Sequence, residues 1–176
     1  KVLSQKEVKR IFDVVRNQKH LLMLQLCYGM GLRVSEVVNL KVSDIDSGRM
    51  QVLIEAGKGK KDRYVPLPSA VLDLLREYYK AYQPKTYLFE GRYGGRYSVR
   101  SVQAVFKNAM KAAKANKPIG IHGLRHSYAT HLLEYGTDMS FIQQLLGHND
   151  IKTTMLYAKV SNAQLNSIKS PLDRIL

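Results

Sequence analysis

The sequence contains a single cysteine, Cys27, which lies inside the apolar run from Leu21 to Met30. One cysteine cannot form a disulfide within the chain, and a lone cysteine in an apolar run is far more often a core side chain than a reactive one. The sequence has no secretory signal peptide, and no apolar stretch approaches the roughly 18 residues that indicate a membrane span. We therefore expect a soluble, intracellular protein.

Acidic residues are also scarce. The chain has 14 Asp and Glu against 28 Lys and Arg, which gives a formal net charge of +14. This excess makes a polyanion the expected partner, with an affinity that falls steeply as salt rises. A ribosomal-type or histone-like protein has a similar balance, so charge alone does not identify the partner. Internal repeats, low-complexity segments and carboxylate clusters suited to magnesium are absent, and 176 residues suffice for one domain.

Apolar spacing and capping residues predict a mostly helical chain. Ser4 and Glu7 have the spacing of a capping box, and apolar residues follow at helical spacing. Helices are expected from Ser4 to about Val15, from Lys19 to Tyr28, after Ser35 as far as Leu40, from Pro68 to Pro84, from Ser98 or Ser101 to about Ala115, and from Ser161 to Ile168, with Pro171 ending the regular structure.

Three strands are expected between the third and fourth of these helices. Their ranges are Val42–Asp46, Arg49–Glu55 and Arg63–Leu67, with a tight turn at Ser47-Gly48 and a loop rich in glycine and lysine at 56–62. The predicted fold class is α+β, mostly α-helical with a small three-stranded antiparallel sheet.

The stretch from His122 to Ser161 gathers the residues most suited to chemistry. His122 and Arg125 lie three apart, so both can project from one helical face. Gly147 is expected to end a second helix, which puts His148 just beyond it, and a third helix carries Tyr157. Imidazole, guanidinium and phenol groups at helix ends predict a phosphate site with a nucleophile beside it. The remaining expected features of this stretch are an inward face of Leu124, Tyr128, Leu132 and Tyr135, a helix end at Gly136, and caps at Asp138 and Asp150.

Five separated motifs support a family resemblance. They are G-L-R-V-S-E at 31–36, G-K-G-K-K-D-R-Y-V-P-L at 57–67, H-x-L-R-H at 122–126, L-L-G-H at 145–148, and the tyrosine nine residues after that histidine. In order and spacing the chain resembles the tyrosine recombinases, the integrase and Xer-like site-specific DNA recombinases. The resemblance implies that residues 1–176 form the catalytic domain. Because the chain starts at Lys1 rather than Met, we expect a fragment from which the preceding DNA-clamping domain, the core-binding domain, is absent.

The resemblance implies that Tyr157 is the nucleophile, with Arg33 and Arg125 as the clamp on the phosphate. A planar guanidinium can donate two hydrogen bonds to phosphate oxygens, which suits this role. Glu36 is expected to orient the site without touching phosphate. For the proton that the departing 5′ oxygen needs, the resemblance indicates Lys58, with Lys60 and Lys61 as alternatives.

The two remaining site residues are histidines. The resemblance implies that His148 donates a hydrogen bond to the scissile phosphate, and that His122 does the same or accepts the phenol proton. His122, His126 and His131 recur at helical spacing, but H-x-x-x-H alone lacks the glutamate and third ligand of known zinc helices. The family mechanism uses no metal and no cofactor, so His126 and His131 are expected to be structural.

The implied function is a site-specific DNA recombinase that cleaves and rejoins DNA through a 3′-phosphotyrosyl intermediate without metal or ATP. The expected partner is double-stranded DNA, bound by a tetramer of the full-length protein on paired sites in the bacterial cytoplasm, at the nucleoid, and no small-molecule substrate is expected. Two alternatives remain: a topoisomerase of type IB, which reseals the same strand and relaxes supercoils, and a catalytically idle DNA-binding module.

Overall fold

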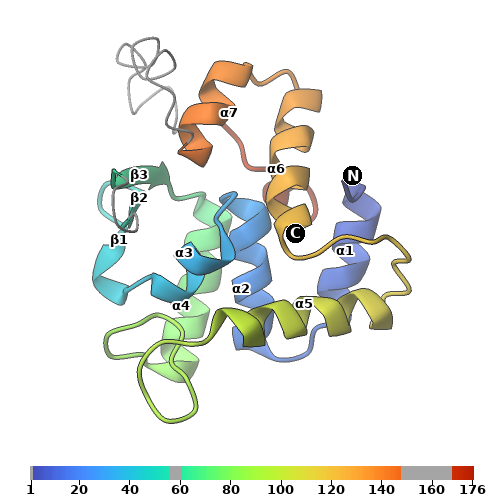
Figure 1. The fold of residues 1–176 in the computed structure, drawn as a ribbon. Helices are drawn as coiled ribbons and strands as arrows, with labels where there is room; N and C mark the ends of the chain where they lie inside the picture. The colour runs from blue at the N-terminus through green and yellow to red at the C-terminus, as the bar shows by residue number, and fades with distance from the viewer. Residues whose placement is uncertain (1, 56–60, 148–167) are drawn as a thin grey trace.

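The computed structural model describes residues 2–55, 61–147 and 168–176, and within them it confirms the predicted fold class. Helices dominate, and a small sheet lies to one side of them (Figure 1). The elements are α1 (Gln5–Asp13), α2 (Gln18–Gly29), α3 (Val34–Asn39), η1 (Val42–Asp44), β1 (Ile45–Asp46), β2 (Gln51–Ile54), β3 (Arg63–Pro66), α4 (Ser69–Tyr82), α5 (Val99–Ala112), α6 (His122–Glu134), α7 (Met139–Leu146) and η2 (Pro171–Arg174).

Helix α2 is the centre of the molecule. It contacts α1, α3, α4, α5, α6 and η2, and its residues from Leu22 to Gly29 are buried on all sides. Figure 1 shows α2 between the sheet on one side and α1 and α6 on the other. A helix that is apolar around its whole circumference must be covered on every face, which explains this position. Cys27, 1% exposed, is one of the core residues, as predicted.

Side-chain caps at helix starts follow the sequence closely. Ser4 and Glu7 form the predicted capping box, and Ser98 is the cap of α5. Asp138 accepts a hydrogen bond from the backbone N–H of Ser140 at 2.9 Å and caps α7. The expected cap at Ser35 is wrong: the cap is Arg33 and α3 begins two residues earlier than expected, because the carboxylate of Glu36 accepts the backbone N–H of Arg33.

The sheet has the order β1-β2-β3, and both pairings are antiparallel. Val52 lies opposite Ile45 on one side and Val65 on the other, and both valines are buried. The predicted first strand is too long, since 42–44 forms η1. There the carboxylate of Asp44 accepts the backbone N–H of Lys41 at 2.9 Å and holds a tight helical turn. The connection to β2 covers 47–50 rather than a two-residue turn.

Helices α6 and α7 are joined by a short turn at Gly136. Its N–H bonds to the carbonyl of Leu133, and the N–H of Thr137 bonds to that of Leu132, which together make a Schellman ending with Gly136 at φ +87°. Leu124, Tyr128 and Leu132 face inward as predicted. Tyr135 does not. Its side chain is 38% exposed, and the guanidinium of Arg174 stacks on its ring at 3.6 Å.

The last described residues pack back onto α2. The hydroxyl of Ser170 donates to the carbonyl of Gly29, and the fully buried Leu172 fills the space beside that glycine. Pro171 starts η2 rather than ending the regular structure as predicted.

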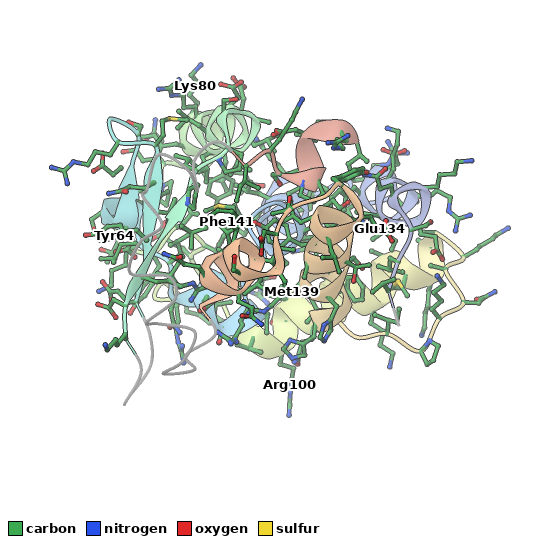
Figure 2. The ribbon with its side chains drawn as sticks, turned by 90° about the horizontal axis from the view of Figure 1, so that it is seen from above. Tyr64, Lys80, Arg100, Glu134, Met139 and Phe141 are labelled. Atoms are coloured by element: carbon green, nitrogen blue, oxygen red, sulfur yellow. The ribbon has the colours of Figure 1, made fainter. Side chains whose placement is uncertain are left out.

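The expected helices around Tyr157 and at Ser161–Ile168 lie largely or wholly outside the described residues. Seen from above, Lys80 and Arg100 project at opposite edges of the molecule (Figure 2). Within the described ranges, no helix is long and apolar enough to cross a membrane.

Candidate active site

Arg33 lies at the N-terminus of α3, directly after a sharp turn. Gly31 makes this turn possible with φ +65°, and the backbone there passes so close to Tyr128 that a Cβ would lie 2.6 Å from its ring. Arg33 itself has extended backbone and precedes the first helical residue, Val34. Its Nη1 lies 3.4 Å from Oε2 of Glu36, and its side chain is 34% exposed, so the guanidinium can still reach a ligand.

Glu36 is the centre of an arginine cluster, which we define as Arg33, Arg63, Arg125 and Glu36. Arg63 donates from Nη1 to Oε2 at 2.6 Å and from Nη2 to Oε1 at 3.1 Å. Arg125 approaches Oε1 to 3.9 Å. Burial raises the pKa of Glu36, but the hydrogen bonds and charge of Arg63 outweigh it, and the pKa is lowered overall. Glu36 is therefore ionised at neutral pH and accepts hydrogen bonds from the neighbouring arginines.

Arg125 is held by backbone groups from two other elements. Nη1 donates to the carbonyl of Gly31 at 2.7 Å, and Nη2 donates to that of Leu146 at 2.8 Å. The side chain is 11% exposed, so Arg125 is not an ordinary surface charge. Burial and the neighbouring charge of Arg33 lower its pKa to about 10, so it still carries its charge at neutral pH.

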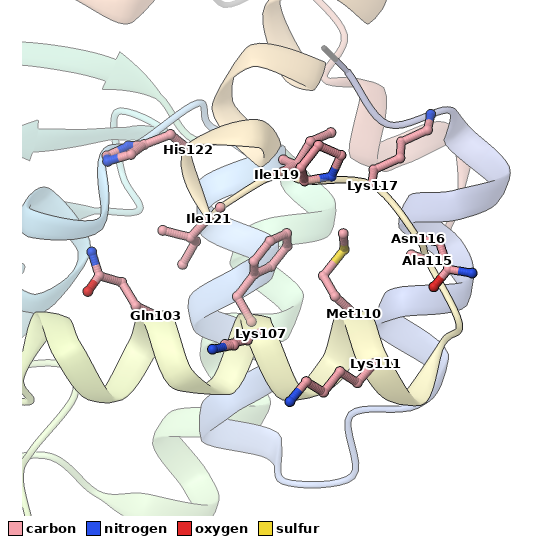
Figure 3. Close-up of a pocket in the computed structure, with 13 residues that line it drawn as sticks. Gln103, Lys107, Met110, Lys111, Ala115, Asn116, Lys117, Ile119, Ile121 and His122 are labelled. Atoms are coloured by element: carbon pink, nitrogen blue, oxygen red, sulfur yellow. The ribbon is translucent and has the colours of Figure 1, made fainter.

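His122 lies at the start of α6 and is exposed. It lines one end of a groove of about 770 Å³ between α5 and the segment 115–121. Figure 3 shows His122 at one end of this groove, with Met110 and Ile121 lining its interior. Lys107, Lys111 and Lys117 line the groove as well. Of these, Lys117 is paired with Glu7 at 2.7 Å.

The structure thus brings together three of the predicted site residues: Arg33, Glu36 and Arg125. It also adds Arg63, for which the sequence predicted only the start of a strand. The one signal was its position in the motif at 57–67, five residues after Lys58. Lys58, Lys60, His148 and Tyr157 lie outside the described residues, and the alternative Lys61 is exposed.

His131 has the structural role predicted for it. Tyr28 Oη donates to Nδ1 at 2.7 Å, and Nε2 donates to the carbonyl of Leu3 at 2.8 Å, so neither ring nitrogen is free for a metal. His126, in contrast, is exposed on α6. Among the residues that the structure describes, no group of three or more His, Cys, Asp or Glu side chains could hold a metal ion.

The fold and the site define a mostly helical α+β domain with a cluster of arginines around one carboxylate. The chain belongs to the phage integrase family, whose model matches residues 1–164. It is similar to the tyrosine recombinase XerA of Pyrococcus horikoshii, with 39% identity over 94% of this chain and 59% of the relative.

Two solved structures share the fold. The crystal structure of XerA recombinase matches with a TM-score of 0.79 and 30% identity over 94% of this chain and 62% of that one. The XerH site-specific recombinase bound to difH substrate matches with a TM-score of 0.74 and 25% identity over 89% of this chain and 49% of that one. The chain spans little more than half the length of most curated relatives that it matches.

Proposed function

We propose that the chain is the catalytic domain of a site-specific DNA recombinase that cleaves and rejoins DNA through a 3′-phosphotyrosyl intermediate. The observation that supports this most is the arginine cluster. Three guanidinium groups surround one carboxylate in a largely buried position, which leaves positive charge in excess. A bound phosphodiester, with its single negative charge, would neutralise part of that excess. The net charge of +14 favours DNA over a small phosphate ester as its source.

In the first step, the oxygen of Tyr157 attacks phosphorus, and the bond from phosphorus to the 5′ oxygen breaks. Arg33 and Arg125 bind the non-bridging oxygens, where negative charge grows in the transition state. Lys58 gives a proton to the leaving 5′ oxygen. His148 donates a hydrogen bond to the phosphate, and His122 either does the same or accepts the phenol proton.

In the second step, a 5′-hydroxyl from the partner duplex attacks the phosphotyrosine, and Tyr157 leaves. One phosphoester bond forms for each that breaks, so no nucleotide cofactor is needed. We further propose that the full-length protein acts as a tetramer on paired DNA sites, in the cytoplasm at the nucleoid. XerH supports the choice of partner, since its structure contains a DNA substrate.

A nicked suicide substrate tests this function. Duplex sites are first selected from a random pool by binding to the Tyr157→Phe variant. In the selected site, a nick lets the short piece with the 5′-hydroxyl diffuse away, which traps the covalent complex. We expect the unmodified chain to form a denaturation-resistant protein–DNA adduct, and Tyr157→Phe to bind DNA but form none.

Three other results would point elsewhere. Adduct from Tyr157→Phe would mean that another residue attacks. DNA binding without any adduct from the unmodified chain would favour the idle DNA-binding module. Relaxation of supercoiled plasmid without exchange between two labelled sites would favour the topoisomerase.

A further inference from the structure

Arg63 makes the shortest side-chain contacts to Glu36 in the arginine cluster. Its two nitrogens reach the two carboxylate oxygens of Glu36 at 2.6 and 3.1 Å, whereas Arg33 and Arg125 stay at 3.4 and 3.9 Å. Paired donation from a guanidinium to a carboxylate is strong and directional. Arg63 contacts both oxygens of Glu36, and the backbone N–H of Arg33 donates to Oε1 at 2.9 Å. Together they keep the carboxylate from closer contact with the guanidinium groups of Arg33 and Arg125.

The same side chain also packs against the end of α7. Its Nε donates to the carbonyl of Leu145 in a long hydrogen bond of 3.4 Å. Gly147 lies so close that a Cβ there would be 2.6 Å from Arg63 Cδ and 3.0 Å from Cζ. Arg63 therefore connects the start of β3 with both α3 and the end of α7.

These three elements are the ones that adjoin the proposed catalytic groups. The loop with Lys58 precedes β3, Arg33 begins α3, and His148 follows Gly147. Both ends of the Arg63–Glu36 pair are largely buried, at 14% and 9% exposure. A buried ion pair gives little net stability, since desolvation offsets much of its attraction. Its main effect is on orientation and on the local charge.

We propose that Arg63 is a positioning residue for the phosphate clamp: it holds the carboxylate of Glu36 so that Arg33 and Arg125 stay directed at the scissile phosphate and keep their positive charge for it. This inference rests on the proposed function. Arg63 itself touches no substrate. Without it, Glu36 moves toward Arg33 and Arg125 and neutralises the charge that the transition state needs.

The test compares two substrates that differ in charge at one position. The selected DNA site is prepared with an ordinary phosphate and with a methylphosphonate, in which a methyl group replaces one non-bridging oxygen and removes its charge. The rate of adduct formation is measured in a single turnover at saturating DNA. The variants of the full chain are Arg63→Ala, Arg63→Lys and Arg63→Ala combined with Glu36→Gln. Arg49→Ala is the matched control, because Arg49 is 79% exposed and lies in the connection between β1 and β2 of the same sheet.

On the phosphate substrate, we expect Arg63→Ala to slow adduct formation by about a hundredfold, since a small misplacement of the binding groups has that effect. On the methylphosphonate, the unmodified chain should be less than about tenfold faster than Arg63→Ala. The transition state of this substrate carries less negative charge, so the clamp stabilises it less. Adding Glu36→Gln to Arg63→Ala should recover part of the loss on phosphate. Arg63→Lys keeps the charge without the paired geometry, and its defect should be intermediate. Arg49→Ala should match the unmodified chain on both substrates.

Equal losses on the two substrates would mean that Arg63 only supports folding, and would overturn the inference. Adduct formation by Arg63→Ala at the unmodified rate would overturn it too. If Arg63→Ala fails to fold, the substrate ratio of Arg63→Lys decides in the same way. If the unmodified chain forms no adduct, the proposed function fails and takes this inference with it, so the two failures are distinguishable.

Discussion

Arg125 donates a hydrogen bond from Nη2 to the carbonyl oxygen of Leu146 at 2.8 Å. The bond joins the first turn of α6 to the end of α7, one residue before Gly147. The carbonyl of Gly31 holds the other terminal nitrogen at 2.7 Å. Two carbonyls from separate segments therefore fix the plane of this guanidinium before any phosphate binds. The side chain then loses less conformational entropy on binding.

The turn at Gly31 yields the first prediction. Gly31→Ala should destabilise the protein by about 2 to 4 kcal/mol, because φ +65° strains an L-residue and the new Cβ would meet Tyr128 at 2.6 Å and Leu146 at 2.9 Å. Urea unfolding gives the free energy. Gly136→Ala is the matched control, with φ +87° but open space around it, and it should lose only about 1 kcal/mol. Equal losses in the two variants would show that crowding at Gly31 has no effect.

The absence of metal from the proposed mechanism yields the second prediction. The charge that develops on the phosphate is assigned to Arg33 and Arg125, so adduct formation should continue at an unchanged rate in excess EDTA. The measurement is the yield of adduct on the suicide substrate with and without chelator. Activity that disappears in EDTA and returns with a divalent ion would require a metal-dependent mechanism.

Buried His131 yields the third prediction, a dependence of stability on pH. Burial lowers its pKa, against a smaller opposite effect of the hydrogen bond to Leu3. The unfolded chain, with a histidine pKa of about 6.5, then binds more protons than the folded chain, so stability falls as the pH falls through that value. The free energy of unfolding should decrease from about pH 7.5 to about pH 5.5.

The variant His131→Gln isolates this contribution, because glutamine keeps a donor and an acceptor but does not titrate. Its stability should change less over the same interval. Burial and Lys19 also lower the pKa of His20, so His20→Gln is the comparison that removes only that second contribution. A profile for His131→Gln as steep as that of the unmodified chain would contradict the assignment to His131.

Arg33, Glu36 and Arg125, which the structure brings together, could be singled out from the sequence because they belong to compact motifs. Arg33 and Glu36 share one turn of helix, and their backbone contact is local. Arg63 could not be found in this way, since its partners Glu36 and Leu145 lie 27 and 82 residues away in the chain. Only the tertiary packing of β3 against α3 and α7 makes those contacts.

The errors in the fold have local physical causes. Apolar and β-branched residues at 42–46 indicated a strand, but the carboxylate of Asp44 bonds to the backbone of Lys41 and produces a helical turn instead. Helical periodicity put Tyr135 in the core. Helix α6 ends before it, and the ring lies at the surface beneath Arg174. Periodicity describes the face of a helix and does not indicate which element from the far end of the chain will cover it.

The last prediction separates the proton donor from the charge clamp. If Lys58 protonates the leaving 5′ oxygen, its loss matters only where that oxygen leaves poorly. A sulfur in the bridging position leaves as a thiolate, with a reference thiol pKa of about 8.5, and needs no acid. Lys58→Ala should therefore recover most of its adduct formation on the sulfur-bridged site.

Arg33→Ala and Arg125→Ala should remain largely defective on that same substrate, because the non-bridging oxygens still carry the transition-state charge. Each variant is measured on oxygen-bridged and sulfur-bridged versions of one site, and the ratio of the two rates is compared. Lys61→Ala is measured beside these variants, since Lys61 is an exposed lysine of the same loop and an alternative proton donor. A gain for Lys58→Ala no larger than that for Arg33→Ala would remove Lys58 as the acid, and a gain for Lys61→Ala would assign the proton to Lys61 instead.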